Sequence, residues 1–262
     1  MSDLPTVLIT GASTGIGAAY AARFASRGHD LVLVARDQAR MEGLAADLRA
    51  KAGVSVDVLR ADLTQSDDLS AVASRLRDDR RIGVLLNNAG ANVAGPFVGQ
   101  SYDAALGLVA LNTTAVVALA SAVAPRLSEA GKGAIVNIGS VVGLAPEYGM
   151  SVYGATKAFV LHFSQALAVE LGPKGVYVQA VLPAGTRTEL WDRAGADMNN
   201  LPPLMETGDL VDAALAGFDR REPVTIPPLH NAALWDAFEA ARRSMIPEFG
   251  QTRPADRYLA AS

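Results

Sequence analysis

Short apolar runs alternate with longer segments of helical composition along most of the chain. The apolar runs lie at 7–10, 31–35, 54–59, 82–86, 134–138, 176–182 and 224–226. The helical segments lie at 16–27, 38–51, 67–78, 102–127 and 152–171. Strands this apolar, separated by helices, are typical of a parallel sheet that is buried on both faces. The pattern predicts an α/β fold with a doubly wound sheet of about seven strands, helices on both faces and a ligand site beyond the carboxyl ends of the strands.

The 262 residues show no internal repeat, low-complexity tract or linker, so we expect a single domain over 1–262. Within it we expect a substrate lid at 189–208 and a C-terminal extension at 229–262. The net charge of -4 provides no basic surface for nucleic acid or an anionic membrane. The chain has no cysteine, and His29 and His230 lack a metal-binding pattern. The first residues do not read as a leader, so we expect a soluble, cytoplasmic protein.

A glycine-rich turn, Thr10-Gly11-Ala12-Ser13-Thr14-Gly15-Ile16-Gly17, follows the first strand and leads into a helix. Glycines let the backbone approach a ligand, and a helix N-terminus offers unpaired N–H groups to a pyrophosphate. Glycines also close purely structural turns. Because the turn lies between a strand and a helix, a dinucleotide site is the favoured interpretation.

The second strand ends at Ala35 and is followed by Arg36 and Asp37. An acidic residue at this point binds the ribose of NAD, whereas an arginine suits the extra phosphate of NADP. Arg36 could instead be a solvated side chain paired with Asp37. Because Asp37 lies beyond the strand end, we predict a preference for NADP(H), with NAD(H) left open.

Polar residues follow the third and fourth strands, as Asp62 and as Asn87-Asn88-Ala89-Gly90. Such residues could simply end strands and form turns. Asn112 is different, because it lies among apolar neighbours in a predicted helix. Its buried amide needs partners, either backbone groups or an ordered water.

Tyr153 and Lys157 lie four residues apart, on one face of a predicted helix, and Ser140 follows the fifth strand. A phenol has a pKa near ~10, and lowering it by ~3 units requires ~4 kcal/mol. An ammonium at ~4 Å supplies ~4 kcal/mol at an effective dielectric constant of ~20. The spacing thus suits a tyrosine that exchanges protons, although alone it also fits an ordinary surface pair.

Taken together, these motifs resemble the short-chain dehydrogenase/reductase family of NAD(P)(H)-dependent oxidoreductases. The resemblance covers about 7–190: TGASTGIG at 10–17, Asp62, NNAG at 87–90, Asn112, Ser140 and YGATK at 153–157. It implies a Rossmann-type fold and a catalytic group of Asn112, Ser140, Tyr153 and Lys157. The cofactor contacts that it implies, with Arg36 added, are Gly11, Ser13, Thr14, Gly15, Ile16, Gly17, Arg36, Asp62, Leu63, Asn88, Ala89, Gly90, Tyr153, Lys157, Pro183 and Thr188.

The sequence departs from the family pattern at two places. Many NADP-using members carry a basic residue where this chain has Thr14, so the phosphate argument depends on Arg36. The family's Pro-Gly after the sixth strand is replaced by Pro183-Ala184-Gly185. Thr188 still maps to the threonine that contacts the nicotinamide carboxamide.

The resemblance implies hydride transfer between NADP(H) and a small-molecule carbonyl or secondary alcohol. Tyr153 would exchange the proton and Ser140 would hold the substrate oxygen. Lys157 would lower the tyrosine pKa and bind the nicotinamide ribose, and Asn112 would hold a water that links Lys157 to solvent. The alternatives are an NAD-dependent alcohol dehydrogenase working oxidatively and a non-catalytic dinucleotide-binding sensor.

The helix after Tyr153 is apolar nearly all round, which implies burial on two sides. Family members associate through this helix and the preceding one, so we expect a homodimer or homotetramer; a helix covered by the C-terminal tail is the alternative. Apolar residues in the predicted lid and nearby loops could line a pocket for a hydrophobic carbonyl compound or be ordinary core. They are Leu190, Trp191, Met198, Leu201, Leu204, Val141, Val142, Leu144 and Val93.

Overall fold

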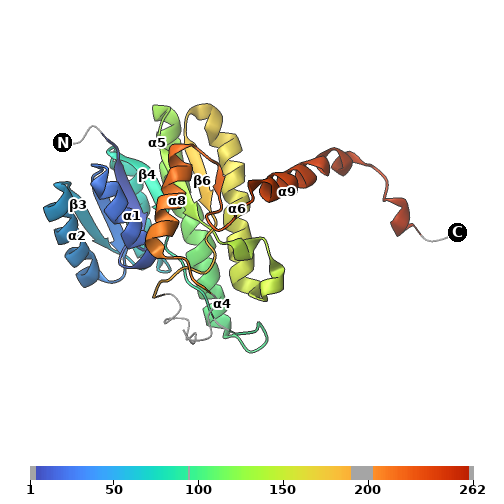
Figure 1. Cartoon of the computed structure of the whole chain (residues 1–262), viewed down its shortest axis with the longest axis horizontal. Coiled ribbons are helices and arrows are strands. Elements are labelled where there is room, and N and C mark those ends of the chain that lie inside the picture. Colours follow the sequence, from blue (N-terminus) through green and yellow to red (C-terminus); the bar gives the residue numbers. More distant parts are fainter. Residues whose placement is uncertain (1–3, 94, 190–202, 260–262) are drawn as a thin grey trace. The chain divides into compact units, whose positions relative to one another are not determined.

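A single parallel sheet of seven strands forms the centre of the computed structural model, which describes residues 4–93, 95–189 and 203–259 (Figure 1). The strand order is β3-β2-β1-β4-β5-β6-β7. The predicted doubly wound α/β fold is confirmed. The strands are β1 (Thr6–Thr10), β2 (Leu31–Ala35), β3 (Val56–Arg60), β4 (Ile82–Asn87), β5 (Ala134–Ile138), β6 (Tyr177–Val181) and β7 (Val224–Thr225).

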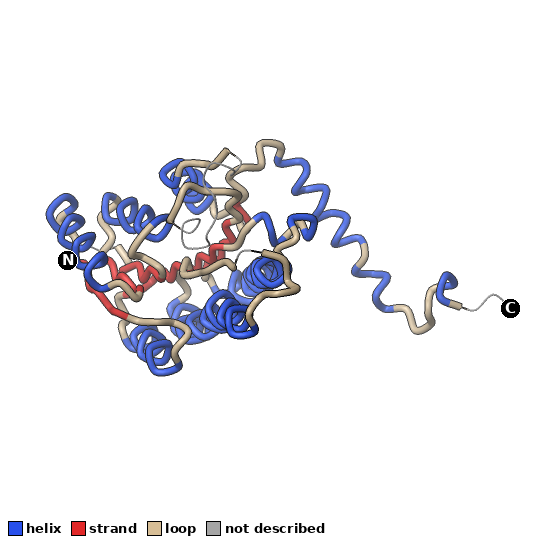
Figure 2. The backbone as a smooth tube through the Cα atoms, turned by 90° about the horizontal axis from the view of Figure 1, so that it is seen from below, coloured by secondary structure: helices blue, strands red, loops and turns tan. Residues whose placement is uncertain are grey.

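Helices cover both faces of the sheet (Figure 2). Because side chains alternate along a strand, Val7 and Ile9 of β1 pack on one face and Leu8 packs on the other. The first face is covered by α1 (Gly15–Ser26), α2 (Gln38–Ala52) and α8 (Thr207–Asp219). The second is covered by α3 (Ser66–Asp78), α5 (Ala115–Ala130) and α6 (Ser151–Leu171). Burial on both faces explains why the central strands are mostly apolar.

The long helical stretch predicted at 102–127 consists of three parts. α4 (Tyr102–Val109) runs into a π-helical turn (Ala110–Thr114), and α5 continues to Ala130. Tyr102–Ala130 is long and apolar enough to cross a membrane, a test that core helices of soluble proteins also pass. The buried face of α5 packs against the sheet and α3, which accounts for its apolar composition. The π turn contains the buried Asn112, and such turns often occur at functional sites.

The sequence pattern did not predict α8. Its buried residues Leu210, Val211, Ala214 and Leu215 follow helical spacing, but the segment begins with Thr207-Gly208, which reads as a turn. The predicted lid at 189–208 therefore overlaps the start of a helix. Most of that lid, residues 190–202, lies outside the described residues. The long helical stretch ends three residues later than predicted, and the other predicted elements begin and end within two residues of their predicted positions.

The chain divides into two compact units, residues 1–227 and 228–262. The second contains α9 (Ala232–Ser244), which is capped by Asn231, whose side-chain oxygen accepts a hydrogen bond from the Ala233 N–H at 3.2 Å. Two short 3-10 turns, Ile246–Gly250 and Asp256–Tyr258, follow it. The sheet and every predicted catalytic residue belong to the first unit. The single-domain organisation stays a prediction.

A chain of buried polar side chains fixes α6 against the sheet. Asn87 at the end of β4 donates a hydrogen bond to the Asn137 side-chain oxygen of β5 at 2.9 Å. The Asn137 amide donates to the Ser164 hydroxyl at 2.9 Å, and that hydroxyl donates to the Val160 carbonyl at 2.7 Å. These bonds set the register of α6, and with it the position of Lys157 two turns earlier.

Candidate active site

The predicted site residues meet at the carboxyl ends of the strands, around the gap between β1 and β4. From β1 the chain proceeds outward to β2 and β3, and then returns to add β4 on the other side of β1. In open α/β sheets this reversal of strand order leaves a crevice in which ligands bind.

The glycine-rich turn is shaped both by its backbone and by its close packing. Gly11 and Gly15 have φ values of +65° and +54°, in the left-handed region that favours glycine. A Cβ on Gly17 would lie 2.3 Å from the Gly11 carbonyl oxygen and 2.5 Å from Asn88 Nδ2. Gly11 and Gly17 are therefore required for contact with the loop after β4, a structural reason that holds besides any cofactor.

The same turn leaves a helix N-terminus open to an anion. α1 begins at Gly15 with no side-chain cap bond from Thr14 and no acidic residue in its first turn. The first N–H groups of a helix have no intrahelical partner, and the helix dipole favours negative charge there. Together with the glycine cradle, this end of α1 fits a pyrophosphate.

Thr10 and Asn88 join the glycine turn to the loop after β4. Asn88 Nδ2 donates to the carbonyl oxygens of Thr10 at 2.9 Å and Gly11 at 3.1 Å. The Thr10 hydroxyl accepts hydrogen bonds from the Asn88 N–H at 2.9 Å and the Ala89 N–H at 3.0 Å. Two motifs that lie far apart in sequence thus form one structure. Sequence reasoning gave Thr10 no role of its own, although it begins the quoted motif.

On the adenosine side, Arg36 directly follows β2 and is exposed. Asp37 instead caps α2, since its Oδ1 accepts a hydrogen bond from the Arg40 N–H at 3.0 Å. Its Oδ2 also lies 3.4 Å from Arg40 Nε. Within the described part of the chain, the predicted alternative of an Arg36–Asp37 pair is therefore not seen, and the guanidinium faces solvent.

Asp62 holds the turn that follows β3. Its Oδ1 accepts hydrogen bonds from the Thr64 N–H at 3.0 Å and the Thr64 hydroxyl at 2.7 Å. Burial favours the neutral carboxyl, but the bonds from Thr64 and the charges of Arg36 and Arg60 outweigh it and lower the pKa of Asp62. The neighbouring Leu63 is buried in the core. The charge of Arg36 thus acts on the residue predicted to contact adenine.

Lys157 is buried at the end of β5. Its side chain is 6% exposed, and Nζ donates to the Ile138 carbonyl oxygen at 2.9 Å. Burial disfavours the ammonium and lowers the pKa of Lys157 to about 8. A Cβ on Gly90 would lie 3.4 Å from both Lys157 Nζ and Asn112 Oδ1, so the glycine gives the two side chains room beside the loop after β4.

Asn112 finds its partners in the Ala91 backbone and the Thr156 hydroxyl. Its Nδ2 donates to the Ala91 carbonyl at 3.0 Å and to the Thr156 hydroxyl at 3.1 Å. Its Oδ1 accepts a hydrogen bond from the Ala91 N–H at 3.0 Å. The amide thus ties the π turn to the loop after β4 and to α6. A water-holding role for Asn112 stays a prediction, and Thr156 enters the site as a residue that sequence reasoning had quoted only as part of a motif.

Ser140 lies close enough to Tyr153 for its hydroxyl to affect the pKa of the phenol. Ser140 follows β5, and its hydroxyl accepts from the Val142 N–H at 3.2 Å and lies 3.3 Å from the Pro183 carbonyl oxygen. Burial raises the pKa of Tyr153, and the hydrogen bond with Ser140 lowers it by less. Burial dominates, so the net shift of this pKa is upward, opposite in direction to the predicted lowering. Lys157 Nζ lies 5.7 Å from the centre of the tyrosine ring and is directed to Ile138.

The segment after β6 completes the site. A Cβ on Gly15 would lie 3.2 Å from Thr188 Cγ2, so Thr188 lies over the glycine turn. Of the predicted apolar lining, Val93, Val141, Val142, Leu144 and Leu204 are half-buried. Leu190, Trp191, Met198 and Leu201 lie outside the described residues. The structure therefore brings the predicted catalytic and cofactor residues together, and part of the predicted apolar lining lies outside the residues that it describes.

Comparison with known proteins agrees with this geometry. Residues 5–199 match the family model described as short chain dehydrogenase. A solved short-chain dehydrogenase from Sphingobium yanoikuyae, in complex with NADPH, is 64% identical, with a TM-score of 0.96. The match covers 98% of this chain and 100% of that one. A bulky-bulky ketone specific alcohol dehydrogenase from Comamonas testosteroni is 58% identical over the same shares, with a TM-score of 0.93.

Curated relatives are more distant. The very-long-chain 3-oxoacyl-CoA reductase of Podospora anserina is 36% identical over 179 residues, which is 67% of this chain. The match spans only 53% of that relative, so about half of its length has no counterpart here. The extent of the family match and these relatives together show that the chain belongs to the short-chain dehydrogenase family.

Proposed function

We propose that this protein is an NADP(H)-dependent oxidoreductase that interconverts a carbonyl compound and a secondary alcohol. The observation that carries the proposal is that Ser140, Tyr153 and the buried Lys157 gather at the carboxyl edge of the sheet, with Lys157 Nζ 5.7 Å from the centre of the Tyr153 ring. A binding protein without catalysis has no need of a phenol, a hydroxyl and an amine gathered at this edge. Family membership supplies independent support.

The raised pKa of Tyr153 suits proton donation in the direction of reduction. At neutral pH the phenol keeps its proton and can give it to a carbonyl oxygen as negative charge develops there. Ser140 would hold that oxygen by a hydrogen bond that strengthens in the transition state. When bound, the nicotinamide supplies the hydride, while the protein orients the reactants and supplies the proton.

Lys157 would then act on both the phenol and the cofactor. Its pKa of about 8 leaves the amine mostly charged at neutral pH, so it favours negative charge on Tyr153 as the proton leaves. The amine also lies beside Gly90, next to the predicted cofactor bed. The Lys157 amine could therefore donate a hydrogen bond to a ligand hydroxyl, such as one of the cofactor ribose, that lies near Gly90.

The NADP preference has two supports. Arg36 presents an exposed guanidinium after β2, and Asp37 is already engaged as the cap of α2. The structure at 64% identity contains NADPH. The glycine cradle and the open end of α1 fit the pyrophosphate of either cofactor, so discrimination depends on Arg36.

For the substrate, we propose a ketone flanked by apolar groups. The half-buried Val141, Val142 and Leu144 follow Ser140 directly and would meet such groups. The alcohol dehydrogenase at 58% identity is named for bulky-bulky ketones. An oxidative NAD-dependent enzyme and a non-catalytic sensor stay as alternatives, and a screen of ketones and alcohols with both cofactors separates them. The cytoplasmic location stays a prediction.

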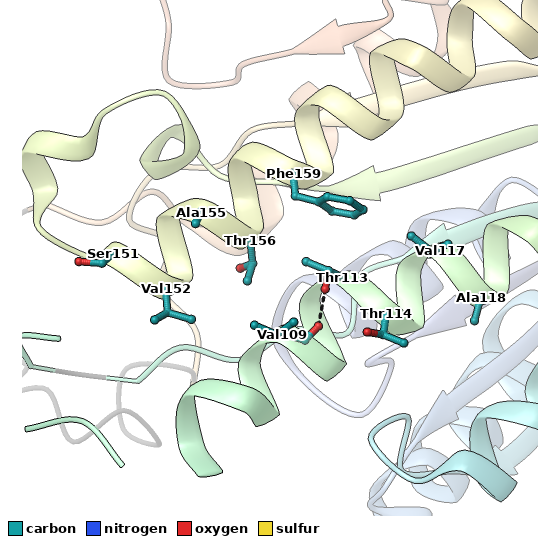
Figure 3. Close-up of a pocket in the computed structure, with 10 residues that line it drawn as sticks. All are labelled: Val109, Thr113, Thr114, Val117, Ala118, Ser151, Val152, Ala155, Thr156 and Phe159. Carbon is teal, nitrogen blue, oxygen red and sulfur yellow. Dashed lines mark hydrogen bonds between the residues drawn. The ribbon is translucent and has the colours of Figure 1, made fainter. Parts of the chain in front are cut away.

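An apolar groove beside α6 supports the proposal that the protein forms a homo-oligomer. It has a volume of about 820 Å³ and lies between α6 and the helical stretch around the π turn (Figure 3). Its lining contains no charged residue, and Phe159 and Val109 there are 38% and 40% exposed. An exposed apolar groove is a suitable surface for association, and a second copy would bring the same groove, as twofold symmetry requires.

Replacing the proton donor tests the mechanism. Tyr153→Phe should lower the reduction rate by about 10²- to 10⁴-fold, the usual contribution of a general acid. Tyr102→Phe, at an exposed tyrosine, serves as the matched control and should leave the rate unchanged. Because the pKa of Tyr153 is raised, the wild-type reduction rate should hold across neutral pH and fall in alkaline buffer, whereas oxidation should gain. An unchanged rate in Tyr153→Phe would show that Tyr153 is not the proton donor.

Removing the guanidinium tests cofactor choice. Arg36→Ala should weaken NADPH binding by about 10- to 100-fold, the range of a charged hydrogen bond of about 1.5–3 kcal/mol. Binding of NADH, which lacks the phosphate, should change little. Fluorescence titration of both nucleotides provides the measurement, and NADH is the internal control. Equal losses for the two nucleotides would contradict the assignment.

Light scattering after size-exclusion chromatography tests the oligomer. The wild type should run as a dimer or tetramer, and Phe159→Glu should shift it toward the monomer, because a charge would be buried in the apolar interface. Val98→Glu, at an exposed apolar residue outside the groove, is the control and should not shift the mass. A monomeric wild type would reject the homo-oligomer.

A further inference from the structure

An ion pair joins two parts of the site that the sheet topology separates widely. Arg40, in the first turn of α2, has its Nη1 2.6 Å and 2.9 Å from the two carboxylate oxygens of Glu189. α2 follows β2, whereas Glu189 follows β6. Three strands, β1, β4 and β5, lie between β2 and β6. At about 4.8 Å for each of the four strand spacings, the two elements are about 19 Å apart along the sheet.

The segment after β6 crosses this distance along the carboxyl edge. The Pro183 carbonyl accepts a hydrogen bond from the Val141 N–H at 2.9 Å, beside the end of β5. Thr188 then lies over Gly15, in the turn after β1. Glu189 reaches α2 through the bond to Arg40. The chain thus passes the ends of β5, β4 and β1 in turn, which are the same strand ends that carry the predicted cofactor residues.

The crossing segment is also held from its other side. The N–H of Arg187 donates to the Met205 carbonyl at 2.9 Å, and the N–H of Met205 donates to the Gly185 carbonyl at 2.9 Å. Arg187 Nε also lies 2.8 Å from Glu206 Oε1, just before α8. The end toward β6 therefore has several backbone anchors, whereas the ion pair with Arg40 ties its far end to α2.

We propose that residues 183–189 form a strap over the dinucleotide crevice, and that the Arg40–Glu189 ion pair fastens this strap and slows release of the bound cofactor. This inference rests on the proposed dinucleotide site. In it, Arg40 and Glu189 are positioning residues that act on the cofactor through the strap. Arg36 has a different task, since it would touch only the phosphate that distinguishes NADPH. The strap should therefore retain NADPH and NADH alike.

The magnitude should be modest, because both partners are about half exposed. Exposed ion pairs seldom change an equilibrium constant by more than about fivefold. We therefore expect Arg40→Gln and Glu189→Gln each to raise the dissociation rates of NADPH and NADH by about three- to fivefold. The double variant should be no faster than either single variant, since the two residues act as one unit. The charge-exchanged pair, Arg40→Glu with Glu189→Arg, should recover part of the slow release.

Stopped-flow displacement of each fluorescent nucleotide from the full-length protein measures these rates. Arg27→Gln is the matched control: Arg27 forms a similarly exposed two-contact ion pair with Asp219, joining the C-terminal end of α1 to α8. It should leave both dissociation rates unchanged. Unaltered rates in Arg40→Gln and Glu189→Gln, or additive effects in the double variant, would overturn the strap. An effect of Arg40→Gln confined to NADPH would also overturn it and assign Arg40 to the phosphate. A wild type that binds neither nucleotide would reject the proposed function itself.

Discussion

A lysine amine buried at the end of β5 is the constraint on which the rest of the site depends. Burying a charge is costly unless it finds partners, and Lys157 has the Ile138 carbonyl as its hydrogen-bond acceptor. The neighbouring elements are arranged to admit it. Gly90 has no side chain that would crowd the amine. The hydrogen bonds that link Asn87, Asn137 and Ser164 hold α6 in the register that brings the amine to this point. The pKa of about 8 shows that the burial is only partly compensated, which is typical of groups in functional sites.

The crevice beside this amine is built by contacts between motifs that are distant in sequence. Thr10 and Asn88 join the turn after β1 to the loop after β4, and Asn112 joins that loop to α6. Much of what looks like a cofactor motif thus has a packing role as well. Gly11 and Gly17 are needed for contact with Asn88 whether or not a nucleotide is present. The two explanations add to each other, because a tightly packed turn also presents its backbone to a ligand at a fixed place.

The sequence predicted the fold well, because strands buried on both faces leave a clear apolar pattern and the glycine-rich turn at 10–17 marks the end of the first strand. It also named the residues that the structure gathers at the carboxyl edge. The pKa of Tyr153 was predicted in the wrong direction, because a four-residue spacing does not show how deeply a phenol is buried or where the lysine points. The Arg40–Glu189 pair was not predicted, since its partners are 149 positions apart and share no motif. The start of α8 was hidden by Thr207-Gly208, which reads as a turn until its buried face is seen.

The central claim is that Lys157 serves the phenol and the cofactor from one buried position. The most direct measurement compares Lys157→Met with the wild type for both ketone reduction and NADPH affinity, with circular dichroism to show that the variant is folded and Lys157→Arg to test whether a cation alone restores function. The account predicts that Lys157→Met loses turnover by at least about 100-fold, within the range of general acid catalysis, and also binds NADPH more weakly. A folded Lys157→Met protein that turns over slowly but binds NADPH as tightly as the wild type would contradict the dual role.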